Sequence, residues 1–282
     1  MNSLLSKVSE GLFLCIAHRG ARSLAPENTL CAAAKALHIG ADLWELDVMM
    51  TADGELVVIH DRDLDRTSNA KRVFPSRRPW RVNEFTLEEI RLLDFGSWFE
   101  KRDPFGQIAA GLVHGDDLKR YRGERAPQLR EALEFTLAQS WYVNVEIKDL
   151  RGTGGHDKVI ARVVDEIARL RMEDRVLLSS FNHGYLKQAK ALNPSIPTGV
   201  LVNRRHVDPV RLMRDLGVDT YHPRVSSLKA GDMRLVREQG IPILAWVVND
   251  EVVMRDLIKK GVNGIFTDFP QLLVPIIRSG DE

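Results

Sequence analysis

The strongest constraint on the fold is a regular alternation of short apolar runs with amphipathic segments. The apolar runs have the length and composition of strands, and the segments between them repeat apolar residues at helical spacing. Eight core strands are expected at Leu12–Ala17, Leu43–Val48, Val143–Ile147, Val176–Ser180, Thr198–Val202, Thr220–His222, Ile243–Val248 and Gly264–Thr267. Helices are expected at Thr29–Ile39, Leu129–Ala138, Lys158–Leu170, Tyr185–Ala191, Pro209–Leu216, Ala230–Gln239, Glu251–Lys260 and Pro270–Ile277. Eight strand–helix units favour one α/β domain over residues 1–282, closed as a (β/α)8 TIM barrel.

An open doubly wound sheet is the main alternative. It lacks support, because no Gly-x-Gly-x-x-Gly sequence opens a helix after a strand. The barrel rhythm is broken once. An extra strand at Leu56–His60 follows the Asp53-Gly54 turn as a hairpin. Residues 62–128 then contain no barrel unit, but a short helix is expected at Leu87–Leu93. A loop of this length inside a compact domain is usually functional.

Acidic side chains gather on one face of two predicted strands. Glu45 and Asp47 are two residues apart, so they point to the same side of the second strand. Glu146 and Lys148 share a face of the third strand in the same way. Two buried carboxylates repel each other, and a bound divalent cation removes that repulsion. Oxygen ligands without Cys or paired His favour Mg²⁺ or Ca²⁺ over zinc. The alternative is that ion pairs neutralise these acids and no metal binds.

Two histidines follow apolar runs. His18 and His60 are therefore expected at the mouth of the barrel, where catalytic groups collect. One histidine alone is usually structural, but two beside a carboxylate cluster are better explained as a proton-transfer pair, because imidazole titrates near neutrality. Arg19 offers a planar fork of donors suited to phosphate oxygens, and Lys148 is the second candidate for binding phosphate.

These residues lie in short motifs that resemble those of the glycerophosphodiester phosphodiesterase (GDPD) family. In chain order the motifs are His18-Arg19-Gly20, Pro26–Thr29, Glu45–Asp47, His60-Asp61, Glu146–Lys148, Trp246–Asn249 and Thr267–Pro270. The resemblance covers the chain from about Leu14 to Pro270, and its N-terminal cluster is specific because four motifs follow one another at tight spacing. Gln128 and Val247 stand where the family more often has Thr, at positions without a chemical role.

The resemblance implies metal-dependent hydrolysis of glycerophosphodiesters to sn-glycerol 3-phosphate and an alcohol. It implies one divalent cation, Mg²⁺ or Ca²⁺, at Glu45, Asp47 and Glu146. It also makes His18 and His60 the general acid and base, in an order that the sequence leaves open. The attacking hydroxyl belongs either to water or to the substrate's own glycerol, and the second route passes through a cyclic phosphate. The insertion at 62–128 is expected to lie over the catalytic mouth and to select the alcohol.

Supporting residues are expected around the first helix and the hairpin. Glu27 helps to order the site in the family, and either Asn28 or Thr29 is expected to cap the first helix. Asp61 alternates to the face opposite His60 and is expected to play a supporting part.

Aromatic residues are expected to form one wall of the site. Phe181 follows the fourth strand and Trp246 lies on the seventh, where both can line an apolar surface for the glycerol carbons or pack the barrel. Asp268 ends the eighth strand, and its simplest interpretation is capping of the last helix.

Three other functions are weighed against this hypothesis. A lysophospholipase-D-like enzyme would need an apolar channel for an acyl chain, and the insertion is more charged than such a lining. A non-catalytic phosphate-binding barrel would not need every proton-transfer and metal position. A sugar-phosphate isomerase or aldolase would leave the acidic triad beside two histidines without a purpose.

Composition limits the partners. A formal net charge of +1 argues against nucleic-acid binding by bulk charge, and no run reaches the roughly 18 apolar residues of a membrane span. Leu12–Ala17 is short and leads directly into His18, so it is expected to be a strand rather than the core of a signal peptide. Cys15 and Cys31 are expected to be reduced, which favours the cytoplasm. The oligomeric state is left open.

Overall fold

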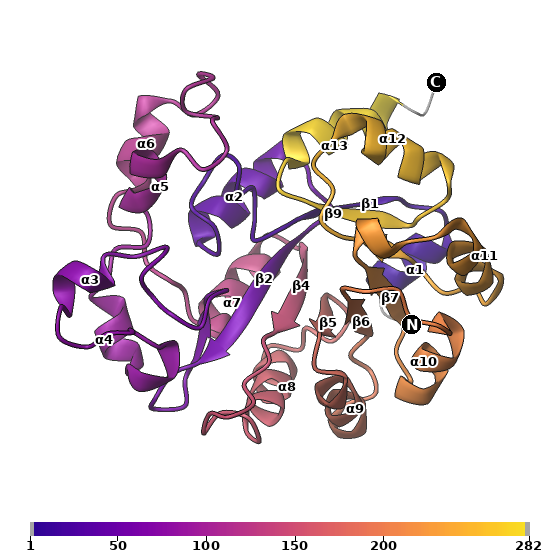
Figure 1. Ribbon diagram of the computed structural model, residues 1–282, viewed down its shortest axis with the longest axis horizontal. Coiled ribbons are helices and arrows are strands. Elements are labelled where there is room, and N and C mark those ends of the chain that lie inside the picture. The colour runs from indigo at the N-terminus through magenta and orange to yellow at the C-terminus, as the bar shows by residue number, and fades with distance from the viewer. Residues whose placement is uncertain (1–2, 280–282) are drawn as a thin grey trace.

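The computed structural model describes residues 3–279 and is a nearly closed barrel of parallel strands with helices outside (Figure 1). The strands are β1 (Leu14–Ala17), β2 (Leu43–Met50), β4 (Tyr142–Ile147), β5 (Val176–Ser180), β6 (Thr198–Val202), β7 (Thr220–Pro223), β8 (Leu244–Ala245) and β9 (Gly264–Thr267). Their order is β7-β6-β5-β4-β2-β1-β9-β8. Parallel bridges from Tyr221 to Ile243 and from Arg224 to Trp246 link the two ends. The predicted (β/α)8 barrel is confirmed.

Helices cover the outside of the barrel, close to the predicted ranges. They are α2 (Leu30–Ile39), α7 (Leu129–Ala138), α8 (Val159–Arg169), α9 (His183–Leu192), α10 (Pro209–Leu216), α11 (Ala230–Glu238), α12 (Glu251–Lys259) and α13 (Pro270–Arg278). Each buries an apolar stripe against the strands; in α8 it comprises Val159, Ile160, Val163 and Ile167. The outward face of β2 packs against α7, where the Trp44 indole N–H donates to Thr136 Oγ1 at 2.9 Å.

An N-terminal helix that the sequence analysis did not predict closes the base of the barrel. In α1 (Ser3–Ser9), Leu4 and Val8 are buried in a cluster of their own. The other members of this cluster are Leu14, Ile16, Leu43, Leu177, Leu244 and Phe266. A seven-residue helix is too short to give a clear periodic pattern, so its stability comes from this packing.

The insertion is more structured than predicted. Strand β3 (Leu56–Val58) pairs antiparallel with β2, as expected for the hairpin, and Gly54 adopts a φ of 82° in its turn. The short helix expected at Leu87–Leu93 is present as α4 (Leu87–Arg91), and further short helices flank it. The insertion also contains α3 (Ala70–Val73), η1 (Val82–Glu84), α5 (Ser97–Arg102) and α6 (Gly115–Tyr121). Buried Phe85 and Phe99 hold it together, and it lies beside α2 at one side of the barrel (Figure 1).

The helices of residues 3–279 include none that is long and apolar enough to cross a membrane.

Candidate active site

The register of adjacent strands brings the three acids together. Asp47 on β2 lies opposite Glu146 on β4, two positions beyond the pairing of Glu45 with Asn144. All four side chains are buried. One ligand oxygen from each of the three carboxylates can be chosen so that these atoms lie within 4.8 Å of one another. The structure therefore brings together the triad that the sequence pattern predicts.

A turn with unusual backbone angles aims Arg19 at these acids. Arg19 has a φ of 56° and Gly20 a φ of 76°, and a Cβ on Gly20 would lie 2.6 Å from Ala32. Only glycine fits this close approach to α2. The turn lets the Arg19 N–H donate to Glu45 Oε2 at 2.8 Å, while its guanidinium Nε lies 3.2 Å from Asp47 Oδ2. Strained backbone of this kind concentrates at functional sites.

Lysine and asparagine complete the surroundings of Asp47 and Glu146. Lys148 Nζ donates to Glu146 Oε1 at 2.6 Å and to Asp47 Oδ1 at 3.2 Å, and Asn28 Nδ2 donates to Asp47 Oδ2 at 2.8 Å. Of the two residues expected to cap the first helix, Thr29 accepts from the N–H of Ala32, whereas Asn28 turns into the site. Against the effect of burial, Lys148 and Arg19 hold the pKa of Asp47 well below its usual range.

Glu45 lacks such neutralisation. Its Oε1 atom is buried and has no hydrogen-bond partner in the described part of the chain. Burial, together with the nearby Asp47 and Glu146 carboxylates, raises the pKa of Glu45 well above its usual range. Such a carboxyl is favoured to hold a proton, and a bound cation would instead stabilise its ionised form.

The net charge around the triad also favours a bound cation. Carboxylates and cations form one linked set: Glu27, Glu45, Asp47, Asp61, Glu146 and Asp268 against Arg19, Arg22, Arg66 and Lys148. In formal charges, these six acids and four bases leave two negative charges, which one divalent cation would balance while keeping Glu45 ionised. The all-oxygen donor set fits Mg²⁺ or Ca²⁺.

His18 is held by a carboxylate from the other end of the chain. Because β1 and β9 are neighbours, the His18 Nδ1 atom lies 2.7 Å from Asp268 Oδ1. Asn249 Nδ2 donates to Asp268 Oδ2 at 2.7 Å, so Asp268 is itself fixed. Burial, and then Arg19, lower the pKa of His18 to about 4, against the opposing effect of Asp268. The interpretation of Asp268 as a helix cap is wrong, because the residue before α13 is Phe269 and has no side-chain cap.

His60 reaches the same site by a different route. Strand β3 runs back along β2, and the Ile59 N–H donates to the Asp47 carbonyl at 3.0 Å, which brings His60 level with the acids. Its Nδ1 lies 2.5 Å from Asp61 Oδ1. The expectation that Asp61 points to the opposite face is wrong, because β3 ends at Val58 and strand alternation does not continue to residue 61. Hydrogen bonds from His60 and Arg66 lower the pKa of Asp61 to about 2, against partial burial.

Glu27 is the meeting point of three arginines. Arg19 Nη1 lies 2.8 Å from Oε1, Arg22 Nη2 lies 2.7 Å from Oε2, and Arg66 Nη2 lies 2.6 Å from Oε1. These cations outweigh burial and lower the pKa of Glu27 far below its usual range. Glu27 therefore stays ionised and orders the cationic side of the site.

A cavity of about 140 Å³ opens between these groups. It is lined by His18, Arg19, Glu45, His60, Asn144, Glu146, Lys148, Ser179, Phe181, Leu201, Trp246, Val247 and Phe266. Phe181 and Trp246 form an edge-to-face pair with centroids 5.4 Å apart, and the indole N–H donates to the His222 carbonyl at 2.8 Å. The cavity thus has one charged side and one apolar wall.

Three residues of the network were missed as site residues by sequence reasoning. Asp268 belongs to the Thr267–Pro270 motif, so this motif could have identified it as a site residue. Arg22 and Arg66 lie in polar loops where arginine is common, and only their convergence on Glu27 distinguishes them.

Comparisons with known proteins agree with this geometry. Residues 18–272 match the model of the Glycerophosphoryl diester phosphodiesterase family. A glycerophosphodiester phosphodiesterase of Caldanaerobacter subterraneus subsp. tengcongensis is 34% identical over 267 residues, which are 95% of this chain and 98% of the relative. One from Bacillus altitudinis is 35% identical over 266 residues, covering 92% of this chain and 96% of its own.

A solved structure is similar in fold as well as in sequence. An Oleispira antarctica phosphodiesterase in complex with the product sn-glycerol-3-phosphate superposes with a TM-score of 0.81 at 28% identity, covering 96% of this chain and 99% of that one. The resemblance inferred from the motifs is confirmed. The chain belongs to the glycerophosphoryl diester phosphodiesterase family and is a phosphoric diester hydrolase.

Proposed function

We propose that this enzyme hydrolyses small glycerophosphodiesters to sn-glycerol 3-phosphate and an alcohol, with one divalent cation and two histidines as general acid and base. The observation that carries the proposal is the arrangement of the cavity. Its lining combines two histidines, each bonded through Nδ1 to its own carboxylate, with two of three clustered acids. The product bound to the Oleispira antarctica structural relative supports the same substrate class.

Glu45, Asp47 and Glu146 would hold the cation. The unpartnered Glu45 oxygen and the surplus of negative charge are the features of this chain that support it. When bound, a divalent cation supplies Lewis-acid polarisation of the phosphoryl oxygens and orients the diester. Arg19 and Lys148 line the same cavity, and we assign to them the binding of phosphate oxygens.

The histidines would move two protons. Each uses Nδ1 for its carboxylate, so Nε2 is the atom left for the substrate. One histidine takes a proton from the attacking hydroxyl as the new P–O bond forms. The other gives a proton to the alcohol oxygen as the old P–O bond breaks. Water or the substrate's own glycerol hydroxyl can serve as the nucleophile.

The size of the cavity favours a small diester. About 140 Å³ beside the Phe181–Trp246 wall suits glycerol carbons, whereas an acyl chain of a lysophospholipid requires more apolar surface. Both cysteines are free thiols, which supports our placement of the enzyme in the reducing cytoplasm.

The proposal is tested by measuring alcohol release from a panel of glycerophosphodiesters and lysophospholipids. We expect chelation to abolish release, and added Mg²⁺ or Ca²⁺ to restore it, with the small diesters cleaved fastest. Full activity after exhaustive chelation would contradict the metal assignment, and faster cleavage of lysophospholipids would contradict the substrate class.

A further inference from the structure

Arg66 joins the two halves of the active site from within the insertion. Its Nε donates to Asp61 Oδ2, the carboxylate that holds His60. Its two terminal nitrogens lie 3.1 and 2.6 Å from the two oxygens of Glu27. A planar guanidinium is suited to bind two carboxylates at once in this way, whereas a lysine is a single point charge.

The backbone around Arg66 is held by the rest of the insertion. The Leu64 side chain is fully buried, and its N–H donates to the Trp80 carbonyl at 2.9 Å. The Val82 N–H donates to the Arg62 carbonyl at 2.8 Å, and Asp63 forms an antiparallel bridge with Arg81. The position of Arg66 therefore depends on residues around 80–82, which have no contact with the substrate cavity.

The two histidine–carboxylate pairs differ in how they are supported. The side chains of His18 and Asp268 are 13% and 9% exposed, and Asn249 fixes the second oxygen of Asp268. The side chains of His60 and Asp61 are 32% and 28% exposed. Within the described part of the chain, the side-chain bonds recorded for Asp61 come from His60 and Arg66 alone. The buried pair is thus supported by Asn249 and by Arg22, whose Nη1 lies 3.5 Å from Asp268 Oδ1, whereas the more exposed pair is supported by Arg66.

We propose that Arg66 is a positioning residue, which holds Asp61 so that His60 keeps its orientation toward the substrate. In this way the insertion completes the active site of the barrel. The inference rests on the proposed function, in which His60 transfers a proton. It goes beyond it in assigning a catalytic effect to a residue outside the cavity.

Removing Arg66 should leave the binding side of the site in place. Glu27 keeps its bonds to Arg19 and Arg22, so the phosphate-facing cations remain ordered. Asp61 loses its second partner and becomes free to rotate into water, taking the His60 ring with it. The loss should therefore fall on kcat rather than on KM.

The test combines Arg66→Gln and Arg66→Lys with His60→Ala in a double-mutant cycle. Arg122→Gln is the matched control, because Arg122 also makes a paired contact with one carboxylate, Glu100, in the insertion. We expect Arg66→Gln to lower kcat by about 10–100-fold with little change in KM, by analogy with residues that orient metal-ligating histidines. Arg66→Lys should recover part of the rate, and Arg122→Gln should match the wild type.

In the His60→Ala background, Arg66→Gln should cost nothing further, because both changes act on one group. A normal kcat in Arg66→Gln, or the same fold-loss with and without His60, would overturn the proposal. A second readout does not use activity. The Nδ1 proton of His60, assigned by proton NMR against His60→Ala, should be seen in the wild type and Arg122→Gln and lost to exchange in Arg66→Gln.

The NMR arm separates the two proposals. If His60→Ala alone hydrolyses diesters at the wild-type rate, the proposed function of His60 is wrong. In that case loss of the Nδ1 signal in Arg66→Gln still supports the positioning role, and an unchanged signal overturns it.

Discussion

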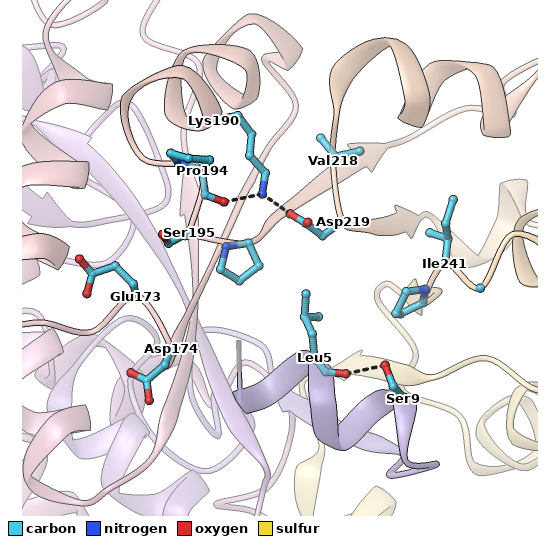
Figure 2. A pocket seen from close by; sticks show the side chains of 13 residues that line it. Leu5, Ser9, Glu173, Asp174, Lys190, Pro194, Ser195, Val218, Asp219 and Ile241 are labelled. Atoms are coloured by element: carbon cyan, nitrogen blue, oxygen red, sulfur yellow. Dashed lines mark hydrogen bonds and ion pairs between the residues drawn. The ribbon is translucent and has the colours of Figure 1, made fainter. Parts of the chain in front are cut away.

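The two ends of the barrel differ in how charged side chains are arranged around their cavities. At the mouth, a cavity of about 140 Å³ is surrounded by buried acids, arginines and histidines that bond to one another. At the base, a larger hollow of about 680 Å³ lies between α1 and the loops that precede four strands. Figure 2 shows Leu5 and Ser9 of α1 on one side of it, and Lys190 donating to the Pro194 carbonyl and pairing with Asp219 on the other.

The charged pair in the larger hollow is more weakly held than the charges at the mouth. The Lys190–Asp219 pair lies at a partly open surface, where such pairs contribute little. At the mouth, burial takes the acids away from water, so their ionised forms require a charged partner or a ligand. The comparison indicates that convergent buried charge is a better guide to the proposed site than the volume of a cavity.

The largest effect is expected from the acidic triad. Glu45→Gln removes a carboxylate that, among residues 3–279, is hydrogen-bonded to the Arg19 N–H alone, so activity should fall to background while the fold is kept. In calorimetry, Mg²⁺ or Ca²⁺ should raise the thermal midpoint of the wild type but not of the variant.

Glu166→Gln is the matched control for that experiment. Glu166 is a buried carboxylate far from the mouth, held by Arg130 on the outer surface. It should lose stability and keep its turnover. Near-normal turnover in Glu45→Gln would show that the acidic triad at the mouth is not needed for activity.

The histidines come next. His18→Ala and His60→Ala should each lower the rate by about 10²–10⁴-fold, the usual range for a positioned proton donor or acceptor. The double variant should lose little beyond the worse single, because the two act as a unit. His206→Ala is the control and should leave the rate unchanged, because this half-buried side chain bonds to the backbone of Asp208 and does not line the cavity.

A leaving group that needs no protonation separates acid from base. On a nitrophenyl diester, the variant that lacks the acid should regain most of its rate, and the variant that lacks the base should not. If both variants cleave natural diesters at near-normal rates, the mechanism is wrong even where the metal site is right.

At the base, stability should respond instead of activity. Leu4→Ala opens a cavity in the cluster under the barrel and should lower the free energy of unfolding by about 2–5 kcal/mol, with kcat unchanged at temperatures where the variant is folded. Lys190→Met on the rim of the hollow should change it by no more than about 1 kcal/mol. A fall in kcat for either variant would break the comparison.

The smallest effect is expected at the rim of the mouth. We propose that the insertion helps to select the alcohol, since Phe105 packs edge-to-face on Phe269 at 5.4 Å and lies under the Arg22 guanidinium. Phe105→Ala should change the relative rates for different alcohols severalfold. It should leave the free energy of unfolding nearly unchanged. An identical ranking in competition assays with mixed diesters would count against that role.

Much of the site was predictable because its signals are local. Period-two alternation places Glu45 and Asp47 on the same face of their strand. Pairing of consecutive parallel strands then predicts that Glu146 lies beside them, as the register of β2 and β4 shows. The Asp53-Gly54 turn correctly predicted the hairpin that leads to His60. Alternation was applied too far at Asp61, where no strand remains.

What the sequence by itself determined is the barrel, the acidic triad, the histidine pair and the family, because periodicity and short motifs are written in neighbouring residues. Only the tertiary structure decided which groups hold these residues in place. Asp268 meets His18 across 250 positions of the chain, and Arg66 spans 39 positions to Glu27. Such pairs form only after the barrel closes and the insertion folds against it, since the free energy of each ion pair depends on burial and on its neighbours rather than on residue type.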